Sequence, residues 1–263
     1  MFGAIIGDII GSTYELHNVK TEQLDLFPKN STFTDDTVLS AAVAEKILNE
    51  AQTQISSKQS YAMWYKQYFK RYPHAGYGQM FSKWAMEEEN SIQRSYGNGG
   101  AMRVTAIGLA YDSIEQIKKE ANASCYYNHN HPEAIKGAQT VAVAVFLAKK
   151  QCDKQEIKKY IQKKFHYRFR PLDEIQEKYV FNSRASYSVP PALEAFFEGD
   201  SYESTIRKAI SIGGDSDTIA CMAGGIAHAY YREIPSEIYN RAMLLLDVGL
   251  KRVAGEFEDK YLR

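Results

Sequence analysis

The chain has 263 residues, of which 44% are hydrophobic, and its 32 acidic side chains balance its 32 lysines and arginines. The balanced charge favours neither nucleic acid nor an acidic membrane as a partner. We find no sign of a linker, a secretory leader or a membrane-length apolar stretch, and we therefore predict a single domain, residues 1–263. Three scattered cysteines favour a reduced, cytoplasmic protein over a disulfide framework, and we expect a monomer.

The first predicted helix, residues 3–15, is an apolar segment with a glycine at every fourth position: Gly3, Gly7 and Gly11. On a helix, this spacing forms a smooth strip against which another helix can pack closely. Asp8 lies inside the apolar run, where a buried, hydrogen-bonded acid is favoured over a direct role in chemistry. Glu15 ends the run at the point where the chain should emerge near a cleft, and a solvated helix end is the alternative for it.

After a polar loop over residues 17–32, the sequence F-T-D-D-T opens a second predicted helix, from the region of Thr34 to about Ala51. Residues 60–90 then carry many aromatic side chains at helical spacing, which predicts that most of them fill the core. A break over residues 72–78 predicts a loop between two helices in this region.

A glycine-rich stretch, S-Y-G-N-G-G-A-M-R-V, follows at residues 95–104. Its glycines would let backbone amides approach a phosphate or a ribose closely. Apolar residues from Ala101 onward would place a helix N-terminus at the same ligand. An ordinary turn explains the glycines equally well, and Tyr96 could stack on a base or pack against the protein.

Further helices are predicted over residues 113–122, 133–150 and 202–212, from Ser188, and from Pro235 to the end. Zinc is disfavoured at His129 and His131, because no cysteine or glutamate stands at zinc-ligand spacing. The basic and aromatic residues 153–178 favour an amphipathic helix with a solvated face over a surface for a polyanion. Since no strand-like alternation or repeat emerges, the predicted fold is all-α, a compact orthogonal bundle of many helices.

The most informative stretch covers residues 212–231, in which two glycines precede Asp215 and Asp217, and Thr218 leads into an apolar helix. Helix capping would need one acid, and two acids beside so apolar a segment cost free energy unless a cation meets them. Together with F-T-D-D-T, these residues supply four carboxylates and two threonine hydroxyls, which suit Mg²⁺, Mn²⁺ or Ca²⁺. Four carboxylates exceed the need of one ion, so a pair of ions about 3.5–4 Å apart is favoured.

Five segments, in this order, resemble the motifs of the ADP-ribosyl glycohydrolase family, which includes the dinitrogenase reductase-activating glycohydrolases. They are G-D-I-I-G-S-T-Y-E (7–15), F-T-D-D-T (33–37), S-Y-G-N-G-G-A-M-R-V (95–104), H-N-H-P-E-A-I-K-G-A (129–138) and G-G-D-S-D-T-I-A (213–220). The resemblance covers nearly the whole chain and implies an all-α fold with two Mg²⁺ (or Mn²⁺) ions. The chain departs from the family at Ser216, where threonine is usual, and at His228 and Arg232, where glycine is common.

The resemblance also implies a role for each matching residue. The metal ligands would be Thr34, Asp35, Asp36, Asp215, Asp217 and Thr218. The diphosphate and adenosine of the substrate would be held by Ser95, Tyr96, Gly97, Asn98, Gly99 and Gly100, with His129 as a further substrate contact. Glu15 would lie beside the metals and substrate, and Glu15, Asp35 and Asp36 are the candidates for a catalytic base or proton carrier.

The implied reaction is metal-dependent hydrolysis of the bond at C1″ of the distal ribose, which releases ADP-ribose from an ADP-ribosylated protein. Hydrolysis of a small ADP-ribose conjugate such as O-acetyl-ADP-ribose is a second hypothesis. A third is an ADP-ribose-binding or immunity protein that counters an ADP-ribosylating toxin, although the complete set of acids argues against mere binding. A fourth, a structural protein stabilised by metal, predicts that chelation unfolds the chain.

Overall fold

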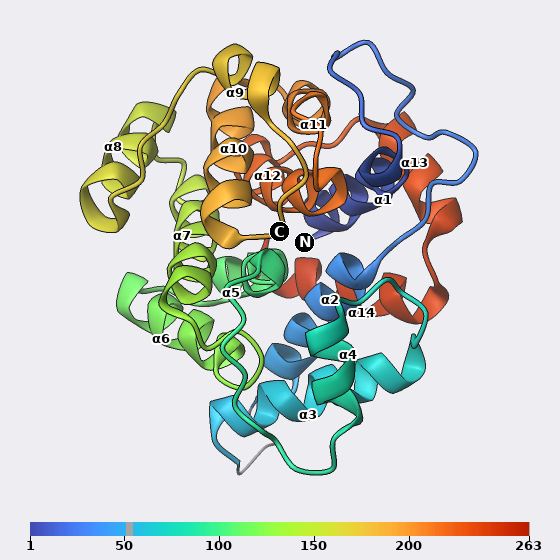
Figure 1. The fold of residues 1–263 in the computed structure, drawn as a ribbon, viewed down its shortest axis with the longest axis vertical. Coiled ribbons are helices and arrows are strands. Elements are labelled where there is room, and N and C mark those ends of the chain that lie inside the picture. Colours follow the sequence, from blue (N-terminus) through green and yellow to red (C-terminus); the bar gives the residue numbers. More distant parts are fainter. Residues whose placement is uncertain (51–54, 263) are drawn as a thin grey trace.

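The computed structural model describes residues 1–50 and 55–262, and the named elements within them are all helices (Figure 1). The α-helices are α1 Phe2–Leu16, α2 Asp35–Leu48, α3 Ser57–Arg71, α4 Gln79–Met86, α5 Thr105–Ala110, α6 Ile114–Cys125, α7 Pro132–Lys149, α8 Lys154–Phe165, α9 Leu172–Lys178, α10 Ala185–Glu198, α11 Tyr202–Ser211, α12 Ser216–Tyr231, α13 Ser236–Leu245 and α14 Val248–Tyr261. A short 3₁₀ helix, η2, covers Asn98–Gly100. The predicted all-α fold is confirmed.

The centre of the molecule is the contact between α1 and α12, which lie side by side although they come from opposite ends of the chain (Figure 1). The predicted glycine strip of α1 faces α12. A Cβ atom on Gly7 would lie 2.2 Å from the carbonyl oxygen of Ala220, and one on Gly11 would lie 2.5 Å from that of Ser216. Because only glycine lets the two backbones meet at this distance, the strip fixes how closely α1 can approach α12.

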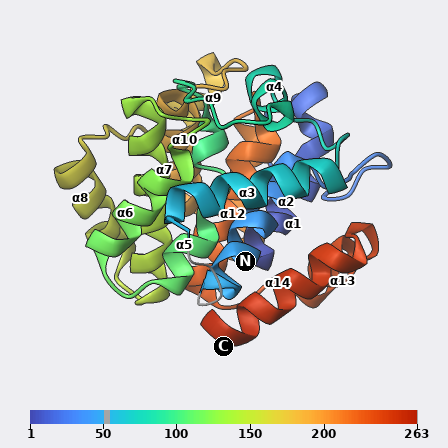
Figure 2. The same cartoon turned by 90° about the horizontal axis from the view of Figure 1, so that it is seen from below.

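The remaining helices surround this central pair. α7, α10 and α11 pack against α12, while α2 contacts α1 and carries α3 and α14 on its other sides. α13 and α14 lie along one edge of the molecule, as Figure 2 shows. The predicted buried helix after residue 132 is confirmed, because the run from Thr140 to Phe146 in α7 is buried throughout.

The helix predicted to open at Ser188 begins earlier, at Ala185, so that Pro190 and Pro191 lie inside α10. Proline has no N–H group, and Pro191 therefore leaves the carbonyl oxygen of Tyr187 without its usual helical donor. The hydroxyl of Tyr179 donates to that oxygen at 3.3 Å. This tertiary contact helps the helix to continue through the two prolines, which local sequence patterns do not reveal.

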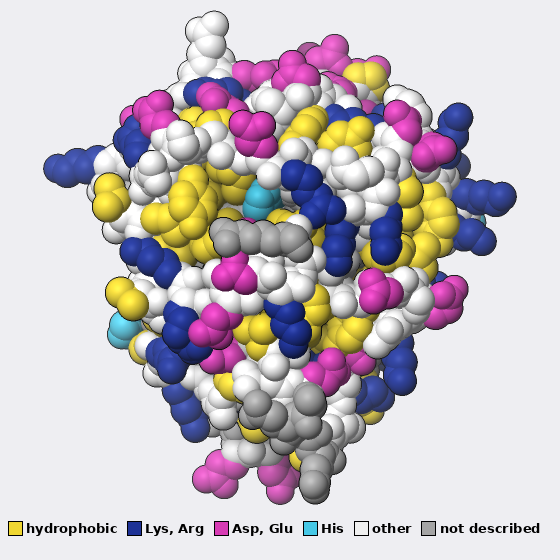
Figure 3. Space-filling model, turned by 180° about the vertical axis from the view of Figure 1, so that it is seen from behind, with side chains coloured by type: hydrophobic (Ala, Val, Ile, Leu, Met, Phe, Trp, Pro, Cys, Tyr) yellow, Lys and Arg dark blue, Asp and Glu magenta, His cyan; other side chains and the backbone are white. Residues whose placement is uncertain are grey.

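Most of the other predicted helices agree with the structure to within a few residues. The helix expected from Ala101 begins at Thr105, and the single helix predicted over residues 153–178 is wrong: the chain leaves α8 at His166, which has a left-handed φ of +56°, and resumes as α9 after Pro171. In the basic segment, α8 buries Ile157, Ile161 and Phe165 on one face, as expected for an amphipathic helix. The predicted end of the second helix near Ala51 lies outside the described residues. Among the helices that the structure describes, none is long and apolar enough to span a bilayer. On the face shown in Figure 3, acidic and basic side chains are interspersed.

Candidate active site

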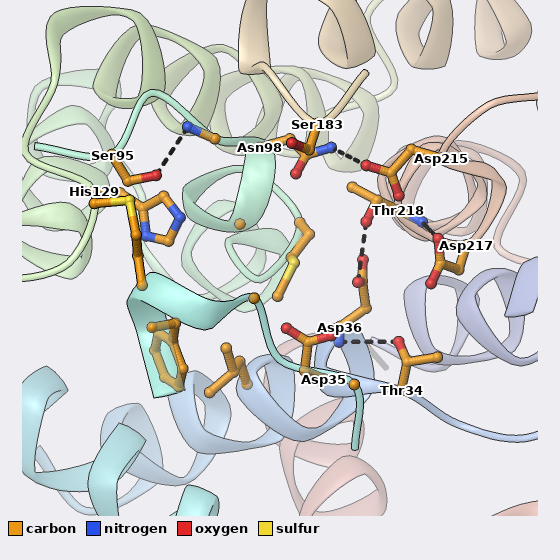
Figure 4. A pocket seen from close by; sticks show the side chains of 18 of the residues that line it. Thr34, Asp35, Asp36, Ser95, Asn98, His129, Ser183, Asp215, Asp217 and Thr218 are labelled. Carbon is orange, nitrogen blue, oxygen red and sulfur yellow. Dashed lines mark hydrogen bonds between the residues drawn. The ribbon is translucent and has the colours of Figure 1, made fainter. Parts of the chain in front are cut away.

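A cavity of about 770 Å³ lies where α1, α2, α12 and the glycine-rich loop meet (Figure 4). Most of the residues singled out from the sequence line it: Glu15, Thr34, Asp35, Asp36, Ser95, Gly97, Asn98, Gly99, His129, Asp215, Asp217 and Thr218. In Figure 4, Asp215 and Asp217 lie on one side of the cavity, and Ser95 and His129 lie on the other. One end of the cavity is therefore acidic, and the other is built from the glycine-rich loop.

At the acidic end, the N-termini of α2 and α12 face each other, as the repeated motif predicts. Thr34 caps α2 by accepting a hydrogen bond from the backbone N–H of Asp36 at 3.2 Å. Across the gap, the hydroxyl of Thr218 donates to Oδ2 of Asp36 at 3.1 Å. Asp217 accepts a hydrogen bond from the N–H of Thr218 at 2.8 Å, which holds its carboxylate at the first turn of α12.

Asp8 lies behind this cluster and binds α1 to the start of α2. It is fully buried, and its two oxygens accept hydrogen bonds from the backbone N–H and the hydroxyl of both Thr34 and Thr37, at 2.5–3.1 Å. The prediction of a buried, hydrogen-bonded acid is confirmed. Because both oxygens are occupied by donors, Asp8 is better suited to holding the α2 N-terminus than to binding a ligand.

The loop before α12 is held to the end of α1, where Glu15 lies. Gly213 and Gly214 both have left-handed backbone conformations, with φ of +74° and +77°, which glycine adopts without strain. The Asn18 amide group accepts from the N–H of Gly214 and donates to its carbonyl oxygen, and it also donates to that of Glu15. Nζ of Lys20 donates to the carbonyl oxygen of Ile212 at 2.6 Å. These contacts fix Glu15 relative to the carboxylates of α12.

Burial raises the pKa values of the carboxyl groups in the cavity, and neighbouring carboxylates add to the shift for most of them. Burial raises the pKa of Asp35 to about 8, and the charges of Asp8 and Asp215 add to the shift. Burial also holds the pKa values of Asp36 and Asp217 well above their usual range, and neighbouring carboxylates act in the same direction. Within residues 1–50 and 55–262, no lysine or arginine forms a salt bridge with these acids. The cluster therefore has no cationic side chain to balance it, and its carboxyl groups hold their protons more tightly than exposed acids do.

The arrangement of the acidic oxygens fits divalent cations that prefer oxygen ligands. Two groups of carboxylates bring their oxygens within 4.8 Å of one another: Asp8, Asp36 and Asp217 in one, and Glu15, Asp215 and Asp217 in the other. Oδ1 of Asp36 is buried and has no hydrogen-bond partner, which is costly for a carboxylate unless a cation meets it. Asp217 belongs to both groups and is therefore the carboxylate that the two candidate ligand sets share.

The glycine-rich loop reaches the acidic end through Asn98. Its Nδ2 donates to Oδ2 of Asp215 at 2.7 Å and to the Ser188 hydroxyl at 2.9 Å, and its backbone N–H donates to the carbonyl oxygen of Ser183 at 2.8 Å. Asn98 therefore holds the loop, the start of α10 and the acidic cluster together. In the loop itself, Ser95 accepts a hydrogen bond from the N–H of Gly97 at 3.1 Å.

Two residues of the predicted substrate-binding loop do not line the cavity. Gly100 is buried, and a Cβ atom there would lie 2.8 Å from the sulfur of Cys125, so this glycine serves close packing. Tyr96 is 49% exposed at the rim, where the Arg184 guanidinium lies 4.7 Å from its ring centroid and His131 contacts its edge. Arg184, distant in sequence, thus packs against the Tyr96 ring at the rim.

The rim contact between Glu133 and Arg184 should make stability pH-dependent. Hydrogen bonds from Arg184 lower the pKa of Glu133 to about 2, with Ser186 contributing and burial opposing. A lowered folded-state pKa adds stability above about pH 4.5 that is lost as the pH falls toward 2. We expect Glu133→Gln to cost about 1 kcal/mol at pH 7, a value kept small because the pair is partly in water. Denaturant unfolding measures the difference in the free energy of unfolding between this variant and the wild type, and that difference should shrink below pH 4.5. Glu88→Gln, at an exposed position, should leave the free energy of unfolding unchanged.

Several residues that line the cavity were not predicted to do so. They are Leu39, Gly76, Gly78, Gln79, Met80, Phe81, Met102, Asn128, Phe181 and Ser183. Gly76 and Gly78 lie in the loop before α4. This loop was predicted from the sequence, but its contribution to the cavity was not. Phe181 and Ser183 lie in the non-helical segment between α9 and α10, and no sequence pattern marks that segment as part of the cavity.

Comparison with known proteins identifies the family to which this site belongs. The model of the ADP-ribosylglycohydrolase family matches residues 1–260. The chain belongs to the ADP-ribosylglycohydrolase family. It is accordingly an enzyme that hydrolyses glycosidic bonds of ADP-ribose.

Individual relatives agree with this assignment. The chain is 30% identical to the human ADP-ribosylhydrolase ARH3, over 87% of this chain and 83% of the relative. It is 24% identical to the ADP-ribosyl-[dinitrogen reductase] glycohydrolase of Rhodospirillum rubrum, over 95% and 91% of the two chains. A solved structure of an ADP-ribosylglycohydrolase-related protein complex has the same fold, with a TM-score of 0.70 at 22% identity over 97% of this chain and 93% of that one.

Proposed function

We propose that this ADP-ribosylglycohydrolase removes ADP-ribose from a modified protein side chain, by cleaving the bond at C1″ of the distal ribose with the help of two Mg²⁺ or Mn²⁺ ions. The observation that carries the proposal is that one cavity joins the acidic starts of α2 and α12 to the glycine-rich loop. A sugar bound at the acidic end would have the diphosphate and adenosine toward the loop. The substrate of the bacterial relative is a protein, as its name states, which favours a protein substrate here.

The side chains that would hold the ions are Thr34, Asp35, Asp36, Asp215, Asp217 and Thr218, with Glu15 beside them. When bound, such ions supply Lewis-acid polarisation of the oxygens around them. The chain itself supplies the position of these groups, because Thr34 and the first turn of α12 hold the carboxylates before substrate arrives. Loss of the side-chain leaving group would give the ribose oxocarbenium character, which the carboxylates stabilise electrostatically.

Glu15 is the favoured proton carrier among the three catalytic candidates. It is half-buried at the mouth of the acidic cluster, whereas Asp36 is buried within it. Burial, with the charges of Asp215 and Asp8, raises the pKa of Glu15, and a raised pKa suits a carboxyl group that must both donate and accept a proton near neutral pH. Asn18 fixes the position of Glu15 by hydrogen-bonding its carbonyl oxygen at 2.9 Å.

The direct test is the release of free ADP-ribose from ADP-ribosyl-arginine and ADP-ribosyl-serine peptides, with Mg²⁺, with EDTA, and with the Asp217→Ala variant. Metal-dependent release from one peptide that the variant lacks would support the proposal and identify the linkage. Release from O-acetyl-ADP-ribose alone would replace it with hydrolysis of small conjugates. No release from any substrate, together with calorimetric binding of ADP-ribose, would favour a binding protein.

Divalent metal should also stabilise the fold, because it binds the native cluster of carboxylates and has no such site on the unfolded chain. At a concentration one hundred times the dissociation constant, binding adds about 2.7 kcal/mol. For a chain of this size we expect Tm to rise by roughly 5–10 °C on replacing EDTA with Mg²⁺ or Mn²⁺. Thermal unfolding followed by circular dichroism measures this. Asp217→Asn should abolish the increase, and an equal increase in that variant would place the ions elsewhere.

A further inference from the structure

Arg103 is a buried cation without a carboxylate partner, and its contacts lead to the cavity. The residue is 0% exposed, and none of the acidic groups within residues 1–50 and 55–262 forms a salt bridge with it. Its guanidinium lies 4.2 Å from the ring centroid of Tyr65 and donates to the carbonyl oxygen of Ser124 at 3.1 Å. It also donates to Oδ1 of Asn128 at 2.6 Å. Burying a charge without an oppositely charged partner costs free energy.

Through Asn128, Arg103 determines which nitrogen of His129 carries the proton. A guanidinium group can only donate, so the Asn128 atom that faces it must be the carbonyl oxygen. The same oxygen lies 2.9 Å from Nδ1 of His129. Because an amide oxygen can only accept, the proton of the imidazole must be on Nδ1. Asn128 and His129 are 2% and 7% exposed, so water competes little for these contacts.

The other nitrogen of His129, Nε2, lies against the glycine-rich loop at the edge of the cavity (Figure 4). A Cβ atom on Gly99 would lie 2.8 Å from Nε2, and one on Gly97 would lie 3.6 Å from it. Burial, with the charge of Arg103, holds the pKa of His129 well below its usual range. The imidazole is therefore neutral at neutral pH, and Nε2 has an open lone pair.

We propose that Arg103 and Asn128 are positioning residues that hold His129 as a neutral imidazole protonated on Nδ1, so that Nε2 accepts a hydrogen bond from a hydroxyl group of the substrate. A neutral acceptor repels the oxygens of a diphosphate, which are acceptors too, and the phosphates must then be bound by other groups of the loop. This inference rests on the proposed function only in taking ADP-ribose as the ligand. The tautomer itself is a property of the free protein.

The test is ¹⁵N NMR of the protein labelled at histidine, with His129 assigned from the spectrum of His129→Gln. We expect a protonated Nδ1 and an unprotonated Nε2 in the free protein from pH 6 to pH 8. Adding ADP-ribose should shift the Nε2 resonance upfield, as expected when a lone pair accepts a hydrogen bond, while adding pyrophosphate alone should not. Protonation of Nε2 when ADP-ribose binds would overturn the proposal, because His129 would then be a donor to phosphate.

Variants of Asn128 separate this positioning role from a merely structural one. Asn128→Leu removes the acceptor that fixes Nδ1–H, so the two tautomers should become mixed and ADP-ribose should bind about tenfold more weakly in calorimetry. Asn128→Asp keeps an acceptor but adds a negative charge, and His129 should then be protonated on both nitrogens at neutral pH. Arg103, the Tyr65 hydroxyl and the Cys125 thiol are titratable groups that face this cluster, and all three remain in these variants.

The controls keep the outcomes distinct. Asn122→Leu makes the same change on the exposed face of α6 and should leave both the spectrum and the binding unchanged. A wild-type tautomer in Asn128→Leu, with circular dichroism showing a native fold, would show that Asn128 does not position His129. A free protein with the expected tautomer that binds no ADP-ribose would contradict the proposed function instead, since the tautomer is measured without ligand.

Discussion

Replacing Asp36 or Asp217 with asparagine should lower the rate of ADP-ribose release by about 10²–10⁴-fold, the range found when one acid–base or charge-stabilising group is lost. Asparagine keeps the size of the side chain but removes the negative charge. Asp36 has a buried oxygen without a partner, and Asp217 belongs to both groups of carboxylates that suit a cation. Steady-state release from the peptide that the wild-type enzyme cleaves measures the loss.

The same two variants should not be less stable than the wild type when EDTA is present. Burial and mutual repulsion raise the free energy of these carboxylates in the folded state, and removing one charge relieves part of that cost. The control is Asp112→Asn, which changes a carboxylate with 85% of its side chain exposed, far from α12 in sequence, and should leave the rate unchanged. Variants that keep wild-type activity would show that the charge of these carboxylates is not needed for catalysis.

Gly7→Ala should destabilise the protein by at least about 3 kcal/mol, which corresponds to a fall in Tm of roughly 6–12 °C. The added methyl group would lie 2.2 Å from the carbonyl oxygen and 2.6 Å from the carbonyl carbon of Ala220. These are backbone atoms of a buried helix, which cannot turn aside as a flexible side chain would. Denaturant unfolding followed by circular dichroism gives the free energy of unfolding.

Gly255→Ala is the matched control, since the same methyl group on α14 meets nothing within 4 Å. Alanine is the better helix former, so this variant should be more stable than the wild type by about 0.5–1 kcal/mol. If Gly7→Ala were to behave like Gly255→Ala, the close packing of α1 on α12 would be disproved. Gly11→Ala provides a third comparison, because its methyl group would lie 2.6 Å from the Cα atom of Asp217 and should lower activity as well as stability.

The parts of the molecule that could be predicted from the sequence are those with a local signal. The glycine strip of α1 repeats at the helical period, and the acids of Asp35–Asp36 and Asp215–Asp217 directly precede long helical patterns. Such signals need only a few neighbouring residues, and they predicted which helix starts would meet. Asp8 was likewise recognisable as an acid within an otherwise apolar helix, and its four hydrogen bonds explain how the fold tolerates it.

What could not be predicted depends on partners far away in the chain. Arg103 sets the tautomer of His129 through Asn128, and the sequence around His129 does not indicate that an arginine lies beside it. Tyr96 lies at the rim beside the Arg184 guanidinium, a partner far away in the chain, and its contact with a ligand stays a prediction. The continuation of α10 through two prolines depends in the same way on the hydroxyl of Tyr179.

The pairing of α1 with α12 also has a consequence for how the protein is made. α1 ends at Leu16, whereas its partner begins at Ser216 and is therefore synthesised roughly 200 residues later. At synthesis rates of about 5–20 residues per second, α1 waits on the order of 10–40 s. During that time Ile5, Ile6, Ile9 and Ile10, all fully buried in the finished protein, lack the helix that covers them. This apolar face therefore stays uncovered until α12 has been made, which makes α1 a segment where a chaperone would be expected to bind.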